Sequence, residues 1–332
     1  MTLEDRLDDA LPAPAPQLAP CSLPSFPERA ESAAVEIKGV TKRFGAVTAV
    51  SNLDLRIPAG SVYGFIGPNG SGKTTTLRMI VNIFRPDEGE IRVFHKSAAE
   101  LCSGSVGYLP EERGLHRGMK VRSLLEFHAE LRGGRPNKAE VNRWLEKFGL
   151  AKFSGQKLET FSKGMSQKVQ FIAAVVPTPR LLILDEPFTG LDPVSAEMIR
   201  TAVLELRQQG VTIILSTHDM NVAEKLCDSI FMIYRSKKVL DGTLESIQQA
   251  YGNNTIRVAT TAGVGAVDGL PGVEACRDLG RMQELRLALG SDPQLVLRAL
   301  LARTAVTHFE VAKPSLHDIF VRIAMPEEQH AA

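Results

Sequence analysis

Gly67-Pro68-Asn69-Gly70-Ser71-Gly72-Lys73-Thr74 is the stretch of this 332-residue sequence that decides the fold. It fits the phosphate-loop pattern G-x-x-x-x-G-K-[ST] at every fixed position. Residues 61–66 before it are apolar and typical of a buried strand, and residues 75–84 after it carry apolar side chains in a helical run. A strand, a glycine-rich loop and a helix therefore follow one another in the order that a nucleotide cradle requires.

The residue types of this loop suit a polyphosphate. Glycines have no Cβ, so backbone N–H groups can approach phosphate oxygens closely, and the positive end of the next helix faces the same anion. Lys73 would reach the β- and γ-phosphates, and Thr74 would offer its hydroxyl to a bridging Mg2+. The alternative is a glycine-rich turn without a ligand. The flanking strand and helix favour nucleotide binding by Gly67 through Thr75.

Composition limits the class of protein. Hydrophobic residues make up 44% of the chain, which is ample for a core, and a net charge of +1 gives no pull toward nucleic acid or an anionic membrane. The four cysteines are too far apart in sequence to form a metal-ligand pair, and their scarcity suits a reducing compartment. No run of 18 apolar residues occurs, and the acidic N-terminus is unlike a signal peptide.

The chain divides into four parts. Residues 1–33 are rich in proline and alanine and predict a disordered leader, with a docking peptide as the alternative. Residues 34–250 form the nucleotide-binding domain, with a helical subdomain inserted at about 115–178 and helices expected at 121–131, 138–148 and 162–176. Residues 251–325 predict a small accessory α/β unit, and residues 326–332 are a tail. Strands are expected in the unit at 256–259, 284–288 and 306–311, and helices at 293–303 and 315–323.

The core of the nucleotide-binding domain reads as an α/β fold with a parallel, doubly wound sheet. Residues 181–184 form a continuous apolar run typical of a central parallel strand, and residues 211–215 form the next. Asp192 and Pro193 are typical of a helix N-cap and first turn, and the helix is expected to end near Gln209. Before the phosphate loop, two short strands are expected at 35–38 and 53–57.

Adjacent carboxylates end the strand at 181–184. Asp185 can hold the Mg2+ shell, and Glu186 can orient or deprotonate an attacking water. The alternative is a solvated strand end. His218, at the end of the next strand, could contact the γ-phosphate, with a structural histidine as the alternative. Phe44 lies about twenty residues before the loop, where it could stack on adenine or belong to the core of a small sheet.

One further motif decides the class. Phe161-Ser162-Lys163-Gly164-Met165 resembles the Leu-Ser-Gly-Gly-Gln signature of ATP-binding cassette (ABC) proteins. The order of the other motifs agrees, and the similarity covers about residues 35–245. The resemblance implies a P-loop NTPase fold with N-terminal antiparallel strands, a parallel core sheet and an inserted helical subdomain. It also implies ATP and Mg2+ as ligands.

Two departures from the family pattern indicate a subgroup. Glu111 replaces the glutamine that usually follows Leu-Pro, and Lys163 and Met165 replace Gly and Gln in the signature. These variants resemble sodium-extrusion and multidrug-type exporters, whose ATPase has a C-terminal appendage ending in a Pro-Ser-Leu-x-Asp-x-Phe box. Residues 314–320 match that box. Glu111 adds negative charge near the triphosphate, so pairing with Arg113 or Arg117 is expected to matter, and Lys163 would add positive charge near a partner's phosphates.

The resemblance implies a mechanism in which two copies pack head to tail. Each ATP would lie between one phosphate loop and Ser162, Lys163 and Gly164 of the other copy. Glu186 would act as base and His218 would contact the γ-phosphate, while Asp192 would link the copies and Glu111 would contribute to the Mg2+ site. Opening and closing would reach separate membrane permease subunits through the groove beside Glu111, at the inner face of the plasma membrane.

Two other readings remain open. A soluble ABC machine acting on DNA or ribosomes usually carries two cassettes or a long coiled coil, and this chain has one cassette and no sustained heptads. A regulatory ATP binder that does not hydrolyse is suggested by Glu111 and the altered signature. The sequence leaves the cargo open between sodium ions and drug-like molecules. Dimer support and regulation are the candidate roles of the appendage.

Overall fold

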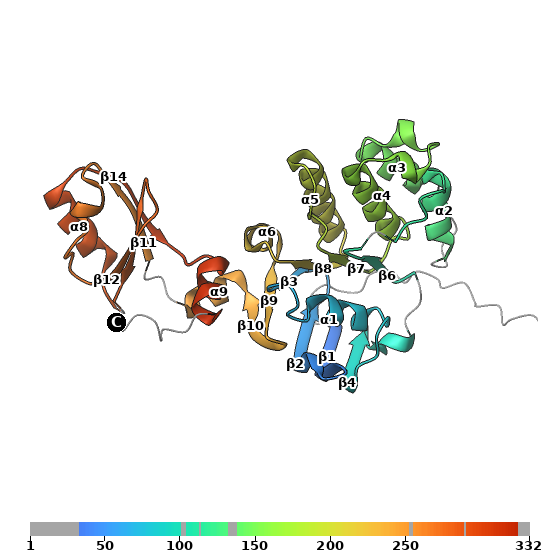
Figure 1. The fold of residues 1–332 in the computed structure, drawn as a ribbon, viewed down its shortest axis with the longest axis horizontal. Coiled ribbons are helices and arrows are strands. Elements are labelled where there is room, and N and C mark those ends of the chain that lie inside the picture. The colour runs from blue at the N-terminus through green and yellow to red at the C-terminus, as the bar shows by residue number, and fades with distance from the viewer. Residues whose placement is uncertain are drawn as a thin grey trace, which may run out of the picture.

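The computed structural model describes residues 33–100, 104–112, 114–131, 138–251, 255–288 and 290–324. The predicted leader, apart from Ala33, and the predicted tail lie outside these ranges. The described residues form three sheets, with strand orders β2-β1-β4-β5, β10-β9-β3-β8-β7-β6 and β12-β13-β11-β14. Helices α2 to α5 cover one face of the six-stranded sheet, and α1 with the first sheet covers the other (Figure 1).

The six-stranded sheet brings the predicted motifs together. Its strands are β3 (Val62–Ile66), β6 (Val106–Leu109), β7 (Leu181–Asp185), β8 (Thr212–Thr217), β9 (Ser229–Tyr234) and β10 (Lys237–Thr243). All neighbours pair in parallel except β10, which runs antiparallel to β9. Asp185 is in register with Ser216, and Ile66 with Thr217. The segments that follow β3, β7 and β8 therefore begin side by side at the carboxyl-terminal end of these parallel strands.

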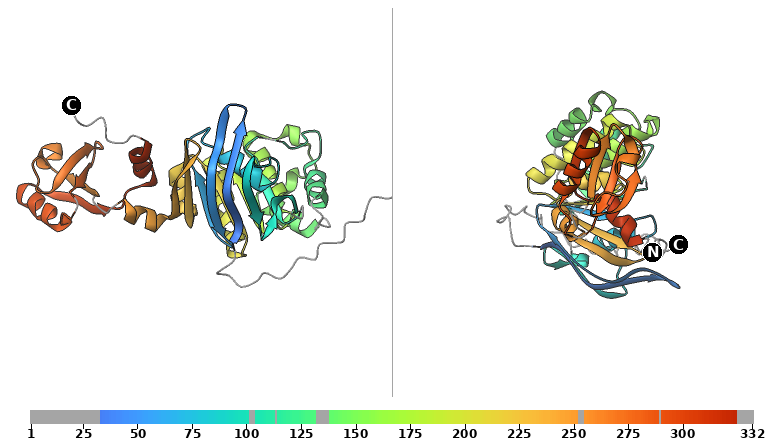
Figure 2. Two further views of the ribbon diagram at one scale, coloured as in Figure 1. Left: turned by 90° about the horizontal axis from the view of Figure 1, so that it is seen from below. Right: turned by 90° about the vertical axis from the view of Figure 1, so that its left-hand side faces the viewer.

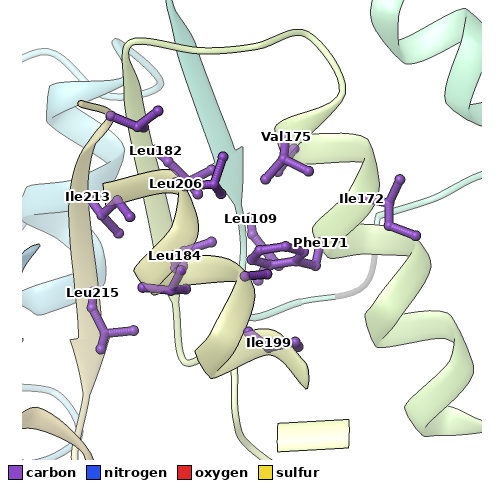
Figure 3. Packing of buried hydrophobic residues seen from close by; sticks show 14 of the residues in the cluster. Leu109, Phe171, Ile172, Val175, Leu182, Leu184, Ile199, Leu206, Ile213 and Leu215 are labelled. Carbon is purple, nitrogen blue, oxygen red and sulfur yellow. The ribbon is translucent and has the colours of Figure 1, made fainter. Parts of the chain in front are cut away.

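The apolar run in β7 is continuous because both faces of the strand are buried. Leu182 and Leu184 belong to the core shared with the helices, and Leu181 and Ile183 belong to the core shared with the first sheet. Figure 3 shows Leu182 and Leu184 among the side chains of this core, together with Phe171 of α4. Because successive side chains of a strand point to opposite faces, β7 contributes apolar side chains to both cores, as expected for a central parallel strand.

The first sheet corrects the predicted strand lengths. It contains β1 (Ala33–Phe44), β2 (Val47–Pro58), β4 (Glu88–Val93) and the short β5 (Lys96–Ser97). The predicted strands at 35–38 and 53–57 were too short, because the pairing of β1 with β2 continues through register shifts. Gly39 (φ +57°) and Asn52 (φ +44°) allow the local backbone irregularity. Their turn-like composition made these positions look like strand ends.

Helix α1 (Lys73–Ile80) is shorter than the predicted run at 75–84. Asn82 takes a left-handed conformation with φ +59°, which a continuing helix cannot contain, and Ile83 is 55% exposed. The inserted helices agree with the prediction, at α2 (Val121–Leu131), α3 (Lys138–Lys147) and α4 (Lys163–Val175). Helix α5 (Pro193–Gln208) begins at the predicted N-cap, because the Asp192 side chain accepts a hydrogen bond from the Ser195 N–H.

Past His218 the chain adds elements that the sequence reading did not include, among them two helices and a strand at 273–278. The strands expected at 256–259, 284–288 and 306–311 and the helix expected at 293–303 are present, with bounds that differ by a few residues at most. Helix α6 (Met220–Leu226) follows β8, and α7 (Leu244–Ala250) follows β10. The third sheet consists of β11 (Thr255–Thr260), β12 (Val273–Asp278), β13 (Gln283–Leu287) and β14 (Val306–Ala312), with α8 (Pro293–Arg303) packed against it. Short 3-10 turns occur at Ala98–Glu100, Ala151–Phe153, Leu158–Thr160 and Gly263–Ala266.

The last helix, α9 (Leu316–Ala324), returns to the nucleotide-binding domain. Leu316 and Ile319 are fully buried in the core of that domain, and the Leu316 N–H donates a hydrogen bond to Glu224 of α6. Figure 2 shows α9 between the third sheet and the six-stranded sheet. The accessory segment therefore contributes its final helix to the packing of the ATPase core. Within the described residues, no helix has the length and apolar character to cross a membrane.

Candidate active site

The phosphate loop connects β3 to α1 through glycines that a side chain would not fit. Gly67 has φ +146° and Gly72 has φ +112°. A Cβ at Gly67 would lie 2.3 Å from the Ile233 carbonyl oxygen, and one at Gly72 would lie 2.3 Å from the Ala49 carbonyl oxygen. Gly72 is the N-cap of α1 and offers no side-chain hydrogen bond. The first N–H groups of α1 are therefore free to meet an anion.

Lys73 folds back over this loop. Its Nζ atom donates hydrogen bonds to the carbonyl oxygens of Gly67, at 2.7 Å, and Pro68, at 3.1 Å. The residue is only 6% exposed, and burial lowers the pKa of the Lys73 ammonium. Nearby carboxylates oppose that change in pKa, in the order Glu186, Asp185 and Glu111. The three predicted acidic residues thus act electrostatically on the phosphate-loop lysine.

Asp185 is fully buried at the end of β7. Neither of its carboxylate oxygens has a hydrogen-bond partner of normal geometry among the described residues, and the Ser216 and Ser71 hydroxyls are likewise buried without a partner. Burial raises the pKa of the Asp185 carboxyl, and the nearby hydroxyls of Ser216 and Thr74 oppose this in part. Buried polar atoms are normally paired, so the chemistry of these oxygens suits the binding of a cation.

Glu186 is held by two neighbours. Its Oε1 atom lies 2.9 Å from Nδ1 of His218, and its Oε2 atom accepts a hydrogen bond of 3.2 Å from the Thr189 hydroxyl. Glu186 is 7% exposed and has φ +51°, a conformation that is strained for a residue with a Cβ. The backbone N–H of Glu186 donates to the Ser216 carbonyl oxygen, which anchors it to β8. The carboxylate therefore has a fixed position beside Asp185.

The donor set at this edge fits Mg2+ held together with a nucleotide. Mg2+ prefers oxygen ligands in an octahedral arrangement and usually keeps waters and substrate phosphates among them. Asp185 offers two unpaired carboxylate oxygens, and Thr74 offers a hydroxyl near them. The described residues contain no group of three or more His, Cys, Asp or Glu side chains placed to hold a metal alone. The ion would thus need phosphate oxygens to complete its shell.

Glu111 lies in the exposed segment after β6, and its charge acts on both Lys73 and Asp185. The expected pairing with Arg117 does not occur in the described structure, and Arg113 lies outside the described residues. Instead, the neighbouring Glu112 lies 3.7 Å from the Arg78 guanidinium of α1. Within the described part of its segment, no cationic side chain forms an ion pair with Glu111, and the Glu111 charge acts on Lys73 of the phosphate loop.

Phe44 lies at the end of β1 and is 45% exposed. Its exposure argues against a role in the core of the first sheet. The ring meets the Phe84 ring edge to face, with centroids 5.4 Å apart, and the Lys42 ammonium lies 5.5 Å from the Phe44 centroid. An exposed aromatic surface supported from its edge can stack on a base.

The signature residues open helix α4. Ser162 is the N-cap, and its hydroxyl accepts a hydrogen bond from the Met165 N–H at 3.3 Å. The Lys163 side chain runs across Gly190, where a Cβ would lie only 2.6 Å from the Lys163 Nζ atom. Gly190 also has φ +71°, so both the lack of space for a Cβ and the backbone conformation favour glycine at this position. These contacts join the signature to the turn before α5.

The structure separates the predicted site residues into two groups. Lys73, Asp185, Glu186 and His218 meet at one edge of the sheet, with Glu111 close enough to act on them. Ser162, Lys163 and Gly164 lie near the turn that contains Asp192, on the face of the sheet opposite α1. The sequence reading missed four contributors: Thr189, Ser216, Phe84 and Gln170. Thr189 and Ser216 each lie within three residues of a predicted site residue, which was the available signal.

Comparison with known proteins agrees with this arrangement. The ABC transporter family model matches residues 50–189, and that of "ATP-binding protein DrrA1-3-like, C-terminal domain" matches residues 242–324. The uncharacterised ABC transporter ATP-binding protein YhaQ of Bacillus subtilis is 39% identical over 287 residues, which are 86% of this chain and 96% of YhaQ. The chain belongs to the ABC transporter ATP-binding family. It is an ABC transporter ATPase with a DrrA-like C-terminal domain.

Two further members of the ABC family extend the comparison. The daunorubicin/doxorubicin resistance ATP-binding protein DrrA of Streptomyces peucetius is 32% identical over 312 residues, covering 87% of this chain and 92% of DrrA. A solved structure described as the ATP binding subunit of an ABC transporter has a TM-score of 0.61 and 29% identity, and the match covers 66% of this chain and 93% of that one. The predicted fold class is confirmed, and the ABC ATPase domain binds ATP as a subunit of a transporter complex.

Proposed function

We propose that this ABC ATPase is the motor subunit of an exporter, in which two copies enclose two ATP molecules between them. The observation that carries the proposal is the buried Glu186 carboxylate, held by His218 and Thr189 next to the unpaired oxygens of Asp185. A carboxylate fixed in this way can accept a proton from water in one defined direction. That arrangement supports hydrolysis over passive binding.

In this proposal the chain binds ATP at both the adenine and the triphosphate. Phe44 stacks on the adenine, and the N–H groups of the phosphate loop surround the phosphates, from Gly67, Pro68, Asn69, Gly70, Ser71, Gly72, Lys73, Thr74 and Thr75. The Lys73 ammonium leaves its carbonyl partners for the β- and γ-phosphates. Mg2+, with Asp185, Thr74 and Glu111 as its proposed protein ligands, neutralises phosphate charge when bound.

Hydrolysis then follows from the geometry at the ends of β7 and β8. A water attacks the γ-phosphorus and gives its proton to Glu186, while the bond from the γ-phosphorus to the bridging oxygen breaks and ADP leaves. His218 orients the Glu186 carboxylate and contacts the γ-phosphate. Positioned general bases contribute about 10²- to 10⁴-fold to rate. Removing the Glu186 carboxylate is thus expected to stop turnover while leaving ATP bound.

A second copy completes each site. Helix α4 packs in the core on one face of the sheet, and α1 packs in the core on the other face. This separation supports the proposal that the signature binds the partner's nucleotide and not the nucleotide of its own chain. Ser162, Lys163 and Gly164 would supply N–H groups and one positive charge to that nucleotide. Asp192, whose carboxylate is already held by Ser195, would contact the partner nearby.

The proposed membrane contact is a cavity of about 270 Å³ in the helical subdomain, on the side that leads to Glu111. Its lining combines the apolar side chains of Leu115, Leu158 and Phe161 with two basic ones, Arg117 and Lys163, and two neutral polar ones, Ser166 and Gln170. A permease segment with apolar and acidic residues would fit such a lining. In this proposal the ATPase lies on the cytoplasmic face of the membrane. The DrrA-like C-terminal match favours drug-like cargo over sodium ions.

The test compares wild type with Glu186→Gln. We expect wild-type protein to hydrolyse ATP at least about 100-fold faster than the variant, and the variant to form ATP-dependent dimers by light scattering. Equal hydrolysis rates would show a passive binder and reject the proposal. A Glu186→Gln protein that stays monomeric with saturating ATP and its permease present would reject the two-copy arrangement. Uptake or efflux of labelled sodium and of an anthracycline then distinguishes the two cargo classes.

A further inference from the structure

Gln170 is a buried polar residue on the inner side of α4, between Val169 and Phe171, which are both fully buried. Its side chain is 5% exposed. The Nε2 atom donates hydrogen bonds to the carbonyl oxygens of Pro110, at 3.1 Å, and Glu112, at 3.2 Å. One amide group therefore holds the backbone on both sides of Glu111.

The segment that carries Glu111 has few other anchors. Strand β6 ends at Leu109, so the ladder with β7 stops just before the segment. The Glu112 side chain is 86% exposed, and its pairing with Arg78 at 3.7 Å is long and open to solvent. Within the described residues, the Gln170 amide is the side chain that hydrogen-bonds to the backbone of residues 110–112. The position of Glu111 thus depends on the position of α4.

The end of helix α4 is buried, whereas Ser162 and Lys163 at its start are exposed. A Cβ at Gly107 of β6 would lie 2.4 Å from the Ala174 carbonyl oxygen, so strand and helix end are in close contact. At 1.5 Å per residue, Gln170 lies about 6 Å and Lys163 about 16 Å from that contact along the helix axis. A tilt of α4 about its end would move Gln170 a little over a third as far as it moves the signature.

We propose that Gln170 is a positioning residue that moves Glu111 together with the signature helix. When the partner's ATP engages Ser162 and tilts α4, the Gln170 amide carries the carbonyl groups of Pro110 and Glu112 with it. Glu111 then shifts relative to the nucleotide of its own chain, so the two ATP sites of the dimer communicate. Gln170 also lines the cavity proposed for the permease. Binding of the permease there would therefore also shift Glu111 through Gln170.

This inference rests on the proposed function, because it assumes that Glu111 acts at the Mg2+ site. No sequence motif marked Gln170, since a glutamine inside an apolar helical run reads as an ordinary core position. The inference makes a coupling prediction. If Gln170 acts only through Glu111, removing both side chains should do no more harm than removing Glu111 alone.

The experiment is a double-mutant cycle on full-length protein, with Glu111→Gln, Gln170→Met and the pair. Methionine keeps the length of the side chain and removes the donor. Gln248→Met is the matched control, because Gln248 also donates from Nε2 to a backbone carbonyl, that of Pro314, at 3.0 Å and far from the phosphate loop. The readouts are kcat, KM for ATP, the Mg2+ concentration at half-maximal rate, and Tm. Gln170→Leu, which is apolar and close in size, serves as a second variant without the donor.

We expect Gln170→Met and Gln170→Leu to lower kcat about 5- to 20-fold with KM for ATP changed less than about 2-fold, corresponding to the loss of hydrogen bonds that fix a catalytic group. Their Mg2+ dependence should shift in the direction that Glu111→Gln shifts it, and the double variant should match Glu111→Gln. Gln248→Met should change Tm by a similar amount and leave the Mg2+ dependence unchanged.

Three results would overturn the inference while leaving the proposed function intact. These are additive losses in the double variant, a normal Mg2+ dependence in Gln170→Met, and a normal Mg2+ dependence in Glu111→Gln, each with hydrolysis still dependent on Glu186. Failure of the proposed function looks different, since wild type and Glu186→Gln would then hydrolyse ATP at the same rate. The two failures are therefore distinguishable in one set of assays.

Discussion

The Nδ1 atom of His218 lies 2.9 Å from the Oε1 atom of Glu186, and the two residues follow neighbouring parallel strands. Glu186 accepts a left-handed backbone conformation, with φ +51°, which costs a residue of this kind about 1–3 kcal/mol. The hydrogen bond of the Glu186 N–H to the Ser216 carbonyl oxygen and the contact with Thr189 hold it there. In this position the Glu186 carboxylate is close enough to the phosphate loop to act on the Lys73 ammonium.

His218→Ala should lower kcat by about 100-fold and change KM for ATP little, because in the proposed mechanism the histidine orients a general base and contacts the reacting phosphate only in the closed site. Steady-state ATPase assays measure both constants. His308→Ala is the matched control, since His308 also pairs with a glutamate, Glu310, at 3.5 Å in the third sheet. Equal losses in the two variants, or a normal kcat in His218→Ala, would contradict a specific role.

Asp185→Asn should abolish Mg2+-dependent hydrolysis and raise the Tm of the nucleotide-free protein. Burial holds the pKa of the Asp185 carboxyl above its ordinary value, so the ionised form is less favourable in the folded state than in the unfolded state. Asp185 therefore begins to cost stability as pH rises above the ordinary aspartate pKa, and the full cost is reached once pH exceeds the raised pKa. Each kcal/mol recovered should raise Tm by about 2–4 °C in a domain of this size.

The pH dependence of this Tm difference checks the sign. The gain from Asp185→Asn should shrink as pH falls below the raised pKa, because Asp185 is then protonated in the folded state. Asp87→Asn is the control with the opposite expectation: hydrogen bonds from Lys42 and the Arg43 N–H lower the pKa of the Asp87 carboxyl. A Tm that falls in Asp185→Asn at neutral pH would show that the carboxylate is stabilising.

Much of the fold of the ATPase core could be predicted from the sequence, because the residues that form each pattern are close together in the chain. The phosphate loop needs its glycines, the apolar run at 181–184 needs burial on both faces, and Asp192 caps its helix through a neighbour three residues away. Each signal lies within a few residues of the feature that it predicts. The six-stranded sheet and the meeting of Lys73 with Asp185 then follow from the carboxyl ends of parallel strands.

Other features depend on contacts between distant segments. Strand β12 carries mostly exposed side chains, so no apolar alternation marked it. Gln170 acquires its role only because β6 brings Pro110 next to α4, sixty positions away in the sequence. The sequence pattern predicts Phe84 at the end of a helix. In the structure it follows the left-handed Asn82 beyond α1, and its ring contacts the Phe44 ring edge to face. Such pairings cannot be predicted from the local pattern of one sequence.

Phe44→Ala should raise the dissociation constant for ATP about 5- to 10-fold, with kcat at saturating ATP unchanged, because stacking contributes about 0.5–1.5 kcal/mol beyond area burial. Phe84→Ala should raise it about 2- to 3-fold, since Phe84 supports the edge of the Phe44 ring. Calorimetric titration with ATP measures both values. Phe127→Ala on α2, which is 38% exposed, is the control. Unchanged affinity in Phe44→Ala would reject stacking on the base.

Lys163→Ala in a Glu186→Gln background should weaken ATP-driven dimerisation, because the signature would lose the positive charge that it offers to the partner's phosphates. Light scattering across a protein concentration series measures the dimer constant. Lys157→Ala is the control, as Lys157 is 59% exposed and pairs with Glu159 of its own segment. Dimerisation that matches the parent in Lys163→Ala would assign Lys163 to its contact with Gly190 instead.

Leu316→Ala should destabilise the ATPase core even though Leu316 belongs in sequence to the accessory segment. The side chain is fully buried in the same core cluster as Trp144, the one tryptophan of the chain. Truncation of a buried leucine costs about 2–5 kcal/mol. Urea unfolding followed by tryptophan fluorescence therefore reports this loss directly, as a lower midpoint for the transition of the ATPase core.

Leu300→Ala provides the comparison, because Leu300 is equally buried but lies in the separate core of the third sheet. Its loss should leave the Trp144 transition unchanged and lower only the stability of the third sheet, followed by circular dichroism. Equal shifts of the Trp144 transition in both variants would mean that the two cores unfold as one unit. If Leu316→Ala shifts nothing, α9 contributes no stability to the ATPase core, and α6 must keep its position without it.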